Sequence, residues 1–296
     1  EWIYFSYEID RITKEFAFAA FFFYYDYGIE SFEYNGNTYN ITKDYLMGRV
    51  RDKVTKEIIK VSNKHTEIIK EIYRKRIIPI FGKFDEFGRQ LEKGKIIIRE
   101  RAENPTGMWH FLEDYAQKHG EYKFEYYTDK NGQQKPFNRT YTENNPDKFT
   151  IVICDHIRKP KRERGYSMKE NVDKWLEYTT ELRNECKFTF VNIVHSNRNL
   201  ANVDRLKFAG EFIFPTSDDS KDTGNVAEES TIFMTLFNPN DEKYNLPKHF
   251  GRLLKDYPNY RSLHITESRD TPSPVHIPLN MYGHINYFTY AENKIK

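Results

Sequence analysis

The chain has 296 residues, of which 38% are hydrophobic and 16% are Phe, Tyr or Trp. That apolar content is enough to build a packed core, which excludes an intrinsically disordered chain. Lysines and arginines number 46 against 44 aspartates and glutamates, so a uniformly basic nucleic-acid-binding protein is excluded, although a local basic patch is not. The longest apolar stretch, residues 16–25, is far shorter than the ~20 residues that a membrane helix needs.

The two cysteines, Cys154 and Cys186, lie far apart in the sequence, and neither belongs to a C-x-x-C motif. This argues against a zinc site or a disulfide framework and for a reducing compartment. No basic segment with a small-residue cleavage site precedes the apolar stretch. We therefore expect a cytoplasmic protein without a secretory signal.

The first third of the chain predicts a strand, a helix, a hairpin and a long second helix. Residues 2–6 predict a short buried strand, and residues 10–25 an aromatic-rich helix. The dipeptide Asn35-Gly36 is a strong hairpin signal. Apolar residues at three-, four- and seven-residue spacing predict one helix from residue 43 to 76. Pro79 is expected to stop this helix from continuing.

The middle of the chain predicts strands, a helix and an inserted hairpin. Residues 95–99 predict a strand, and residues 105–118 a helix that follows Asn104 and is closed by Gly120. Polar and aromatic residues alternate around Asn131-Gly132, which predicts a surface hairpin inserted at about residues 121–148. The continuous apolar run 149–154 is typical of a central parallel strand.

The last part of the chain predicts a helix and then mostly strands. Ser167-x-x-Glu170 is a capping box that opens a helix. Further strands are predicted at residues 188–194, as a second central strand, and at 231–237, 262–266, 275–279 and 284–290. We therefore expect an α/β fold with a central, mostly parallel sheet flanked by helices and a C-terminal run of strands, in a single domain.

Polar residues follow the predicted strands where α/β folds bind ligands, just past the carboxyl ends. They are Glu8, Asp155, His195 and the cluster Glu267-Ser-Arg269 that follows the predicted strand 262–266. An apolar strand that ends in aspartate is what a magnesium–phosphate site requires, because the carboxylate holds the ion or its water shell against a nucleotide. One such strand end is weak evidence, and four together are a stronger signal.

The chain resembles the C-terminal, RecA-like ATPase domain of DnaB-type replicative helicases. The resemblance also allows a phage-encoded member of this family. The resemblance follows the family order over nearly the whole chain, in the segments 5–9, 151–157, 190–198, 219–229, 231–237 and 267–272. It implies a P-loop NTPase core over residues 1–296 that lacks its Walker A segment.

The same resemblance implies the roles of the strand-end residues. Glu8 would polarise the attacking water, and Asp155 would serve Mg²⁺ beside ATP. His195 would sense the γ-phosphate, and Arg269 would be an arginine finger that reaches the ATP of the neighbouring subunit. These roles suit phosphoryl transfer, which depends mainly on positioning and charge neutralisation.

The DNA contacts and partners are likewise implied by the resemblance. Lys221, Asp222 and Gly224 would lie on a loop that grips the backbone of single-stranded DNA, which is a sequence-blind contact. The family implies a homo-oligomeric ring, expected to be a hexamer, together with a primase or helicase loader and no membrane. A phage-encoded member would work in the host cytoplasm.

The sequence departs from the family pattern at three points. It contains no G-x-x-x-x-G-K-[ST] motif, and the family's P-loop would precede Glu1, so residues 1–296 alone are expected not to bind ATP well. Glu267 stands where the family has a lysine, and His195 stands where it has a glutamine. The histidine would make the sensor pH-dependent.

Other interpretations of these residues stay open. Glu8 could cap the helix that follows it, His195 could be a structural strand-end histidine, and Arg269 could form a surface salt bridge. We expect His156 to be a supporting loop residue, and the basic run 158–164 to be either a solvated loop or a DNA contact. As a whole, the chain could be a catalytically inactive DNA-binding or scaffold subunit, or a metal-dependent nuclease that uses Asp155, Glu8 and His195.

Overall fold

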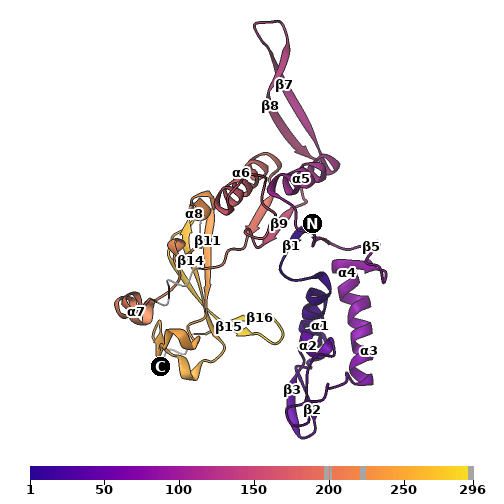
Figure 1. Cartoon of the computed structure of the whole chain (residues 1–296), viewed down its shortest axis with the longest axis vertical. Helices are drawn as coiled ribbons and strands as arrows, with labels where there is room; N and C mark the ends of the chain where they lie inside the picture. The colour runs from indigo at the N-terminus through magenta and orange to yellow at the C-terminus, as the bar shows by residue number, and fades with distance from the viewer. Residues whose placement is uncertain (197–199, 201, 221–224, 293–296) are drawn as a thin grey trace. The chain divides into compact units, whose positions relative to one another are not determined.

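The computed structural model describes residues 1–196, 200, 202–220 and 225–292 and divides the chain into two compact units (Figure 1). The first unit consists of residues 1–8 and 96–194, and the second of residues 9–95 and 195–296. None of the helices in the described ranges is long and apolar enough to cross a membrane.

The first unit is built on a parallel sheet with the strand order β10-β9-β1-β6. Its elements are β1 (Trp2–Ser6), β6 (Ile96–Arg99), α5 (Pro105–His119), β7 (Gly120–Thr128), β8 (Gln134–Glu143), β9 (Ile151–Asp155), α6 (Met168–Cys186) and β10 (Thr189–Asn192). The prediction that residues 149–154 form a central strand is confirmed by β9. The prediction of a second central strand is wrong in position, because β10 is the edge strand of this sheet.

One face of the parallel sheet packs against helices. Ile3 and Phe5 of β1 and Cys154 of β9 are fully buried, and the Trp175 ring of α6 meets Phe5 edge-on with the ring centroids 5.9 Å apart. The predicted capping box opens α6 as expected. On the opposite face Trp2 is 44% exposed. Because β1 and β9 run parallel and in register, their polar ends meet at one rim of the sheet.

The second unit combines a helical part with an antiparallel sheet of order β11-β14-β15-β16. Its helical part contains α1 (Arg11–Tyr27), β2 (Ser31–Tyr34), β3 (Asn37–Asn40), α2 (Lys43–Leu46), α3 (Asn63–Ile72), the π-helical turn η1 (Tyr73–Ile77), α4 (Ile78–Phe81), β4 (Gly82–Phe84) and β5 (Gln90–Lys93). Its later part contains α7 (Val203–Ala209), α8 (Asn225–Glu229), β11 (Ile232–Phe237), β12 (Lys248–His249), β13 (Arg252–Leu253), β14 (Tyr260–Ser268), β15 (Val275–Tyr282) and β16 (Tyr287–Tyr290). The predicted hairpin at Asn35-Gly36 and the run of C-terminal strands are both confirmed.

The prediction of one helix from residue 43 to 76 is wrong. The chain leaves the helix after Leu46 and begins a new one after Ser62, whose hydroxyl accepts a hydrogen bond from the His65 N–H as an N-cap. Between them the buried Asp52 carboxylate accepts the backbone N–H groups of Val54 and Thr55 and fixes a turn. Local side-chain hydrogen bonds of this kind compete with a helix, and here they override the apolar spacing.

The helical segment also runs past Pro79 rather than ending there. A single π-helical turn, η1, links α3 to α4, and the proline lies in the first turn of α4. Ile77 and Ile78 keep helical backbone angles, so Pro79 lies inside a continuous helical segment, where its missing N–H interrupts the hydrogen-bond ladder, and the π-helical turn directly precedes this interruption. The helical segment ends instead at Gly82, whose φ of 91° suits glycine.

The buried face of the antiparallel sheet is polar. Tyr260 and His249 are fully buried, and His264 is 1% exposed. The His249 Nε2–H donates to the Ile213 carbonyl oxygen at 2.7 Å, so its Nδ1 accepts from the Tyr260 hydroxyl at 3.2 Å. The Tyr260 oxygen in turn lies 3.0 Å from His276 Nε2, and it accepts the N–H of that nitrogen. Both nitrogens of the neutral His249 ring and the Tyr260 hydroxyl are therefore paired.

Candidate functional site

Asp155 ends β9 at the rim of the parallel sheet. It lies opposite Ser6, the last residue of β1, and its carbonyl oxygen accepts the Tyr7 N–H at 3.1 Å. Its Oδ2 accepts a hydrogen bond from the Tyr4 hydroxyl at 2.7 Å. Burial, together with this hydrogen bond, raises the pKa of Tyr4 well above its ordinary value. Tyr4 therefore remains a neutral donor that holds the Asp155 carboxylate in place.

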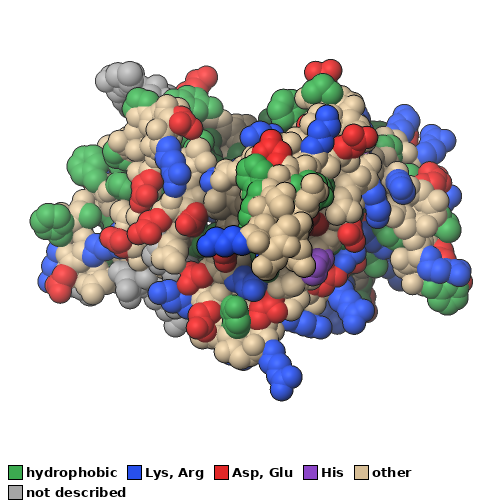
Figure 2. All heavy atoms as spheres, turned by 90° about the horizontal axis from the view of Figure 1, so that it is seen from above, with side chains coloured by type: hydrophobic (Ala, Val, Ile, Leu, Met, Phe, Trp, Pro, Cys, Tyr) green, Lys and Arg blue, Asp and Glu red, His purple; other side chains and the backbone are tan. Residues whose placement is uncertain are grey.

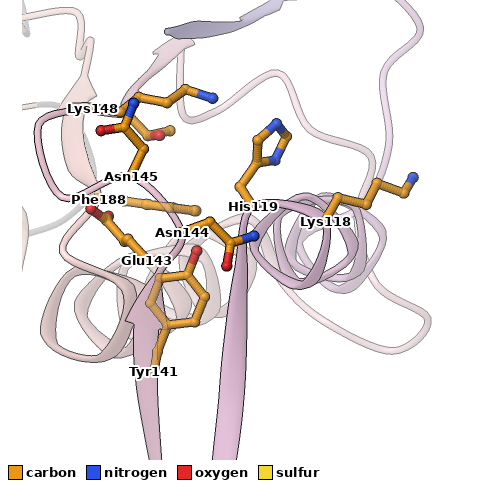
Figure 3. A pocket seen from close by; sticks show the side chains of 9 residues that line it. Lys118, His119, Tyr141, Glu143, Asn144, Asn145, Lys148 and Phe188 are labelled. Carbon is orange, nitrogen blue, oxygen red and sulfur yellow. The ribbon is translucent and has the colours of Figure 1, made fainter.

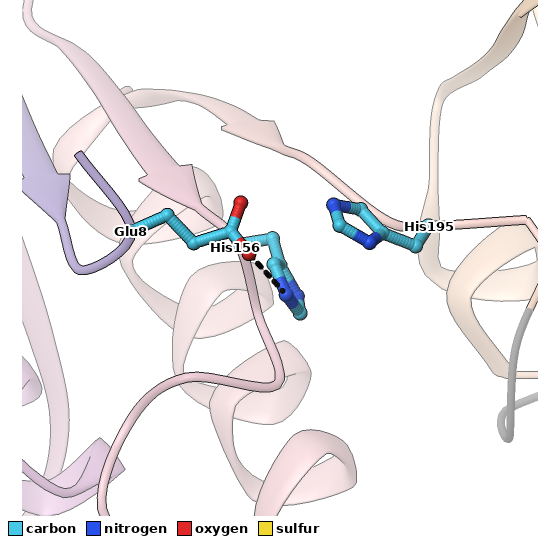
Figure 4. A group of neighbouring side chains, drawn as sticks. All are labelled: Glu8, His156 and His195. Atoms are coloured by element: carbon cyan, nitrogen blue, oxygen red, sulfur yellow. Dashed lines mark ion pairs between the residues drawn. The ribbon is translucent and has the colours of Figure 1, made fainter.

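Glu8 lies just past β1 at the same rim (Figure 4). Its Oε1 is 3.5 Å from His156 Nε2 and 3.4 Å from Lys159 Nζ. His156 is buried, whereas Glu8 is exposed. The sequence predicted only a supporting role for His156. Because His156 directly follows Asp155, its place in the sequence already indicated that it lies at this rim. A glutamate, an aspartate and a lysine are thus gathered at the ends of two adjacent strands.

A basic loop, residues 158–164, follows β9 and is fixed by buried polar groups. The Glu163 carboxylate accepts the Thr106 backbone N–H at 2.9 Å, and the buried Asn171 side chain accepts the Glu163 N–H at 2.9 Å. Burial alone would raise the pKa of Glu163, but the hydrogen bonds from Thr106 and Asn104 hold it below its ordinary value. The exposed side chains of the loop include Lys161, Arg162 and Arg164. The loop therefore presents cations from a fixed backbone.

The other predicted site residues belong to the second unit. His195 is exposed and follows the last residue of β10 by three positions, and it is drawn with Glu8 and His156 in Figure 4. Arg269 follows β14, is exposed, and donates from its guanidinium to the Glu228 carbonyl oxygen at the end of α8. The predicted DNA-binding residues Lys221, Asp222 and Gly224 lie outside the described residues. Of the predicted residues, Glu8 and Asp155 are the pair that β1 and β9 bring together.

A second acidic cluster lies at the base of the β7–β8 hairpin. The Arg139 guanidinium of β8 is 2.8 Å from Glu181 and 2.6 Å from Glu185 of α6, and 3.2 Å from Glu113 of α5. The carboxylate oxygens lie within 4.8 Å of one another, as in a metal site. Because an arginine already occupies their centre, we interpret this cluster as the anchor of the hairpin.

A cavity of about 220 Å³ lies at the opposite rim of the parallel sheet (Figure 3). Two of its lining residues directly precede strands, Thr150 before β9 and Phe188 before β10. Lys148 and His119, which also line it, both pair with the Glu1 carboxylate. The rest of the lining is Lys118, Tyr141, Glu143, Asn144 and Asn145. Ligands of parallel α/β sheets bind at the carboxyl ends, so this cavity is not the candidate active site.

Solved structures resemble this fold. A DnaB-like replicative helicase, described with its interactions with primase, matches with a TM-score of 0.57 and 12% identity over 98% of this chain and 52% of that chain. The ATPase domain of a second helicase matches with a TM-score of 0.58 and 12% identity over 98% of this chain and 74% of that one. The chain thus spans about half the length of the DnaB-like helicase. By sequence, no protein-family model and no curated protein matches.

This chain has the RecA-like fold of DnaB-type helicase ATPase domains. The predicted fold class is confirmed, and so is the resemblance to these domains at the level of the fold. The structural match places no roles on individual residues, because 12% identity carries the fold alone.

Magnesium is the metal that such a fold implies, and the rim can be tested for it. Mg²⁺ prefers hard oxygen ligands and keeps several waters, so one or two carboxylates are enough to hold it. Asp155 and Glu8 supply carboxylates at the ends of adjacent strands, and the Tyr4 hydroxyl orients one of them. These residues fit a magnesium ion that also contacts a nucleotide.

Proposed function

We propose that this chain is the motor domain of a replicative DNA helicase, which couples ATP hydrolysis to movement along single-stranded DNA and to duplex unwinding. One observation carries the proposal: Glu8 and Asp155 stand at the carboxyl ends of adjacent central strands of a RecA-like sheet. Asp155 would hold Mg²⁺, which would supply charge neutralisation at the phosphates. Glu8 would orient and polarise the attacking water.

The remaining assignments complete the proposed motor. Arg269 would reach the ATP of a neighbouring subunit in a homo-oligomeric ring, expected to be a hexamer, and His195 would sense the γ-phosphate. Lys221, Asp222 and Gly224 would contact the DNA backbone. Residues 1–296 carry no Walker A motif, and the residues assigned here are those of the other parts of such a motor. A primase or a loader, in the cytoplasm of the cell or of a phage host, would be its partner.

The basic loop adds a route for DNA contact at the same rim. On the face drawn in Figure 2, lysine and arginine side chains are interspersed with aspartate and glutamate side chains. A phosphate contact on this face must therefore come from a local group of cations. Lys161, Arg162 and Arg164 project from a loop that Glu163 and Asn171 hold in place. They offer such a local contact beside the proposed nucleotide site.

The decisive experiment is ATP hydrolysis by the natural protein that contains this chain, measured with Mg²⁺ and single-stranded DNA. Asp155→Asn should lower turnover by about a hundredfold or more, because metal-held charge neutralisation is lost. Asp147→Asn, the same change in an exposed turn, is the matched control and should leave turnover unchanged. Equal turnover of the two variants would refute the role of Asp155.

Glu267, which stands where the family has a lysine, favours a second candidate, a RecA-like DNA-binding or scaffold subunit that hydrolyses no nucleotide. The two functions differ in how DNA affinity responds to nucleotide. A motor should bind single-stranded DNA with an affinity that changes on addition of a non-hydrolysable ATP analogue. A scaffold should bind it equally well with and without the analogue. Cleavage of DNA with Mg²⁺ and no ATP would support neither and would point to a nuclease.

A further inference from the structure

The β7–β8 hairpin is an arm that projects from α5 and α6 of its own unit (Figure 1). Its base is held by Arg139 between the three glutamates of the helices, and the Tyr122 hydroxyl lies 3.2 Å from Glu113 and 3.1 Å from Cys186 Sγ. Beyond this anchor, residues 123–128 of β7 are all exposed. The arm is therefore fixed at one end and presents a two-stranded ribbon at the other.

The two edges of this ribbon differ. Across the hairpin Glu125 pairs with Asn138, but the next residue, Tyr126, pairs with Pro136, so Phe137 is an extra residue on β8. A bulge and a proline are devices that protect an edge strand from further pairing. β7 carries neither over its nine residues, all of which are described. Its outer edge is thus the one that can accept another strand.

The side chains of the arm favour a protein strand over a nucleic acid. Phe124 and Tyr126 are 48% and 55% exposed, and Tyr127 and Phe137, which contact each other, are 49% and 62% exposed. Residues 120–143 hold four acidic and four basic side chains, so the arm has no net charge. A DNA backbone would need a basic surface, whereas exposed aromatic residues without net charge suit a protein interface.

We propose that β7 pairs with β7 of a second copy of this chain, antiparallel and about a two-fold axis at Phe124. The register is self-complementary. With Phe124 opposite its own copy, Lys123 lies opposite Glu125 of the partner subunit, and Glu125 lies opposite Lys123 of the partner subunit. On the other face Tyr122 lies opposite Tyr126 of the partner subunit. Opposite charges and aromatic pairs at directly opposed positions both stabilise antiparallel strands.

This contact joins two hairpins into one four-stranded sheet. A two-stranded ribbon is marginal alone, and added strands stabilise it. The contact uses the same patch on both copies, so it closes a dimer and cannot by itself build a ring, which needs head-to-tail contacts. It is therefore independent of the ring in the proposed function, and it needs no nucleotide. Its area is that of one strand pair, so we expect micromolar affinity.

Sedimentation equilibrium of the chain, without nucleotide or DNA, tests the pairing. The unchanged chain should be in a monomer–dimer equilibrium. Lys123→Glu and Glu125→Lys should each weaken the dimer by about tenfold, because each places two pairs of like charges opposite one another. The double variant carries both changes and restores opposite charges in the same register, so its affinity should return to within about threefold of the original. Both residues are exposed, and circular dichroism should show an unaltered fold in every variant.

A monomeric chain at about 100 μM, well above the micromolar affinity expected of one strand pair, would overturn the proposal. A double variant that dimerises no more tightly than the single variants would overturn it as well.

Disulfide crosslinking tests the position of the two-fold axis at Phe124. Directly opposed residues of antiparallel strands have Cα atoms about 4.5–5.5 Å apart, within the range of a disulfide. With diamide as the two-electron oxidant, Phe124→Cys should give a covalent dimer, as two thiols lose two protons and two electrons to form one S–S bond. Phe137→Cys, on the bulged strand, should stay monomeric on a denaturing gel. The native Cys154 and Cys186 are fully buried and should not react. Equal crosslinking of the two variants would refute the register.

Discussion

The four-stranded parallel sheet and the four-stranded antiparallel sheet keep their polar residues in different places. The parallel sheet of the first unit buries apolar side chains such as Phe5 and Val152 on one face and has polar residues at the strand ends. The antiparallel sheet of the second unit buries polar rings of its own, His264 and Tyr260, together with His249 of β12. Polar groups at a strand end meet ligands, whereas polar groups beneath a sheet must satisfy one another. Substitutions should therefore alter chemistry in the first sheet and stability in the second.

Acid should have the largest effect, and it should act on the second sheet. Burial, together with the neighbouring histidines, lowers the pKa of His249 from 6.5 to about 4 and that of His264 from 6.5 to about 3. Above pH 6.5 these rings are neutral in both the folded and the unfolded chain, so their titration takes nothing from the free energy of unfolding. As the pH falls from about 6.5 towards 4, the unfolded chain takes up protons that the folded chain does not, and stability is lost. Each ring can contribute at most about 1.4 kcal/mol per pH unit.

Two probes separate the units in that experiment. The three tryptophans, Trp2, Trp109 and Trp175, all belong to the first unit, so their fluorescence follows that unit. Hydrogen exchange of residues 260–268 follows β14 in the second unit. The protection factors of the β14 amides, which correct for the intrinsic pH dependence of exchange, should fall as the pH falls from 6.5 to about 4, before the fluorescence changes. Simultaneous loss of both signals would contradict the difference between the sheets.

Arg139→Leu should have the next largest effect, and it tests the ionic anchor at the base of the β7–β8 hairpin. It leaves Glu113, which is 6% exposed, facing Glu181 and Glu185 without the arginine. Removing one partner of a buried ionic group costs about 3 kcal/mol in the free energy of unfolding. Urea unfolding followed by tryptophan fluorescence measures it. Arg139→Lys keeps the charge and should cost clearly less, and equal losses for the two variants would show that the charge is not what matters.

Tyr260→Phe should destabilise the second unit by about 2 kcal/mol, because a ring nitrogen of the buried His249 and one of the half-buried His276 each lose a partner. The change removes the hydroxyl that donates to His249 and accepts from His276. Hydrogen exchange of β14 under native conditions reports the loss. Tyr290→Phe in β16 is the matched control, because Tyr290 is 61% exposed and its hydroxyl can bind water. A cost below about 0.5 kcal/mol for Tyr260→Phe would mean that the network is not stabilising.

The sequence predicted the first sheet better than the second unit, and the reason is local. Apolar runs that end in Glu8 and Asp155 and the capping box at Ser167 are short-range signals, and the structure follows them. The prediction of one helix over residues 43–76 failed because Asp52 and Ser62 use side-chain hydrogen bonds that apolar spacing does not register. The histidine network could not be predicted, because it joins residues from β12, β14 and β15 that only tertiary pairing brings together.

Glu8→Gln should have the smallest effect on stability, and it distinguishes the proposed role of Glu8 from a structural one. Glu8 is exposed, and its ion pairs to His156 and Lys159 are 3.5 and 3.4 Å long, so their loss should cost within about 0.5 kcal/mol of unfolding free energy. Turnover of the natural protein should nevertheless fall by about a hundredfold, because the amide cannot polarise the attacking water as a carboxylate does. Glu33→Gln, in the exposed β2–β3 hairpin, is the matched control for both measurements. A loss of about 2 kcal/mol in unfolding free energy is far more than an exposed ion pair usually contributes. Such a loss with unchanged turnover would mean that Glu8 holds the ends of β1 and β9 together. The chemistry at this rim would then have to come from Asp155 alone.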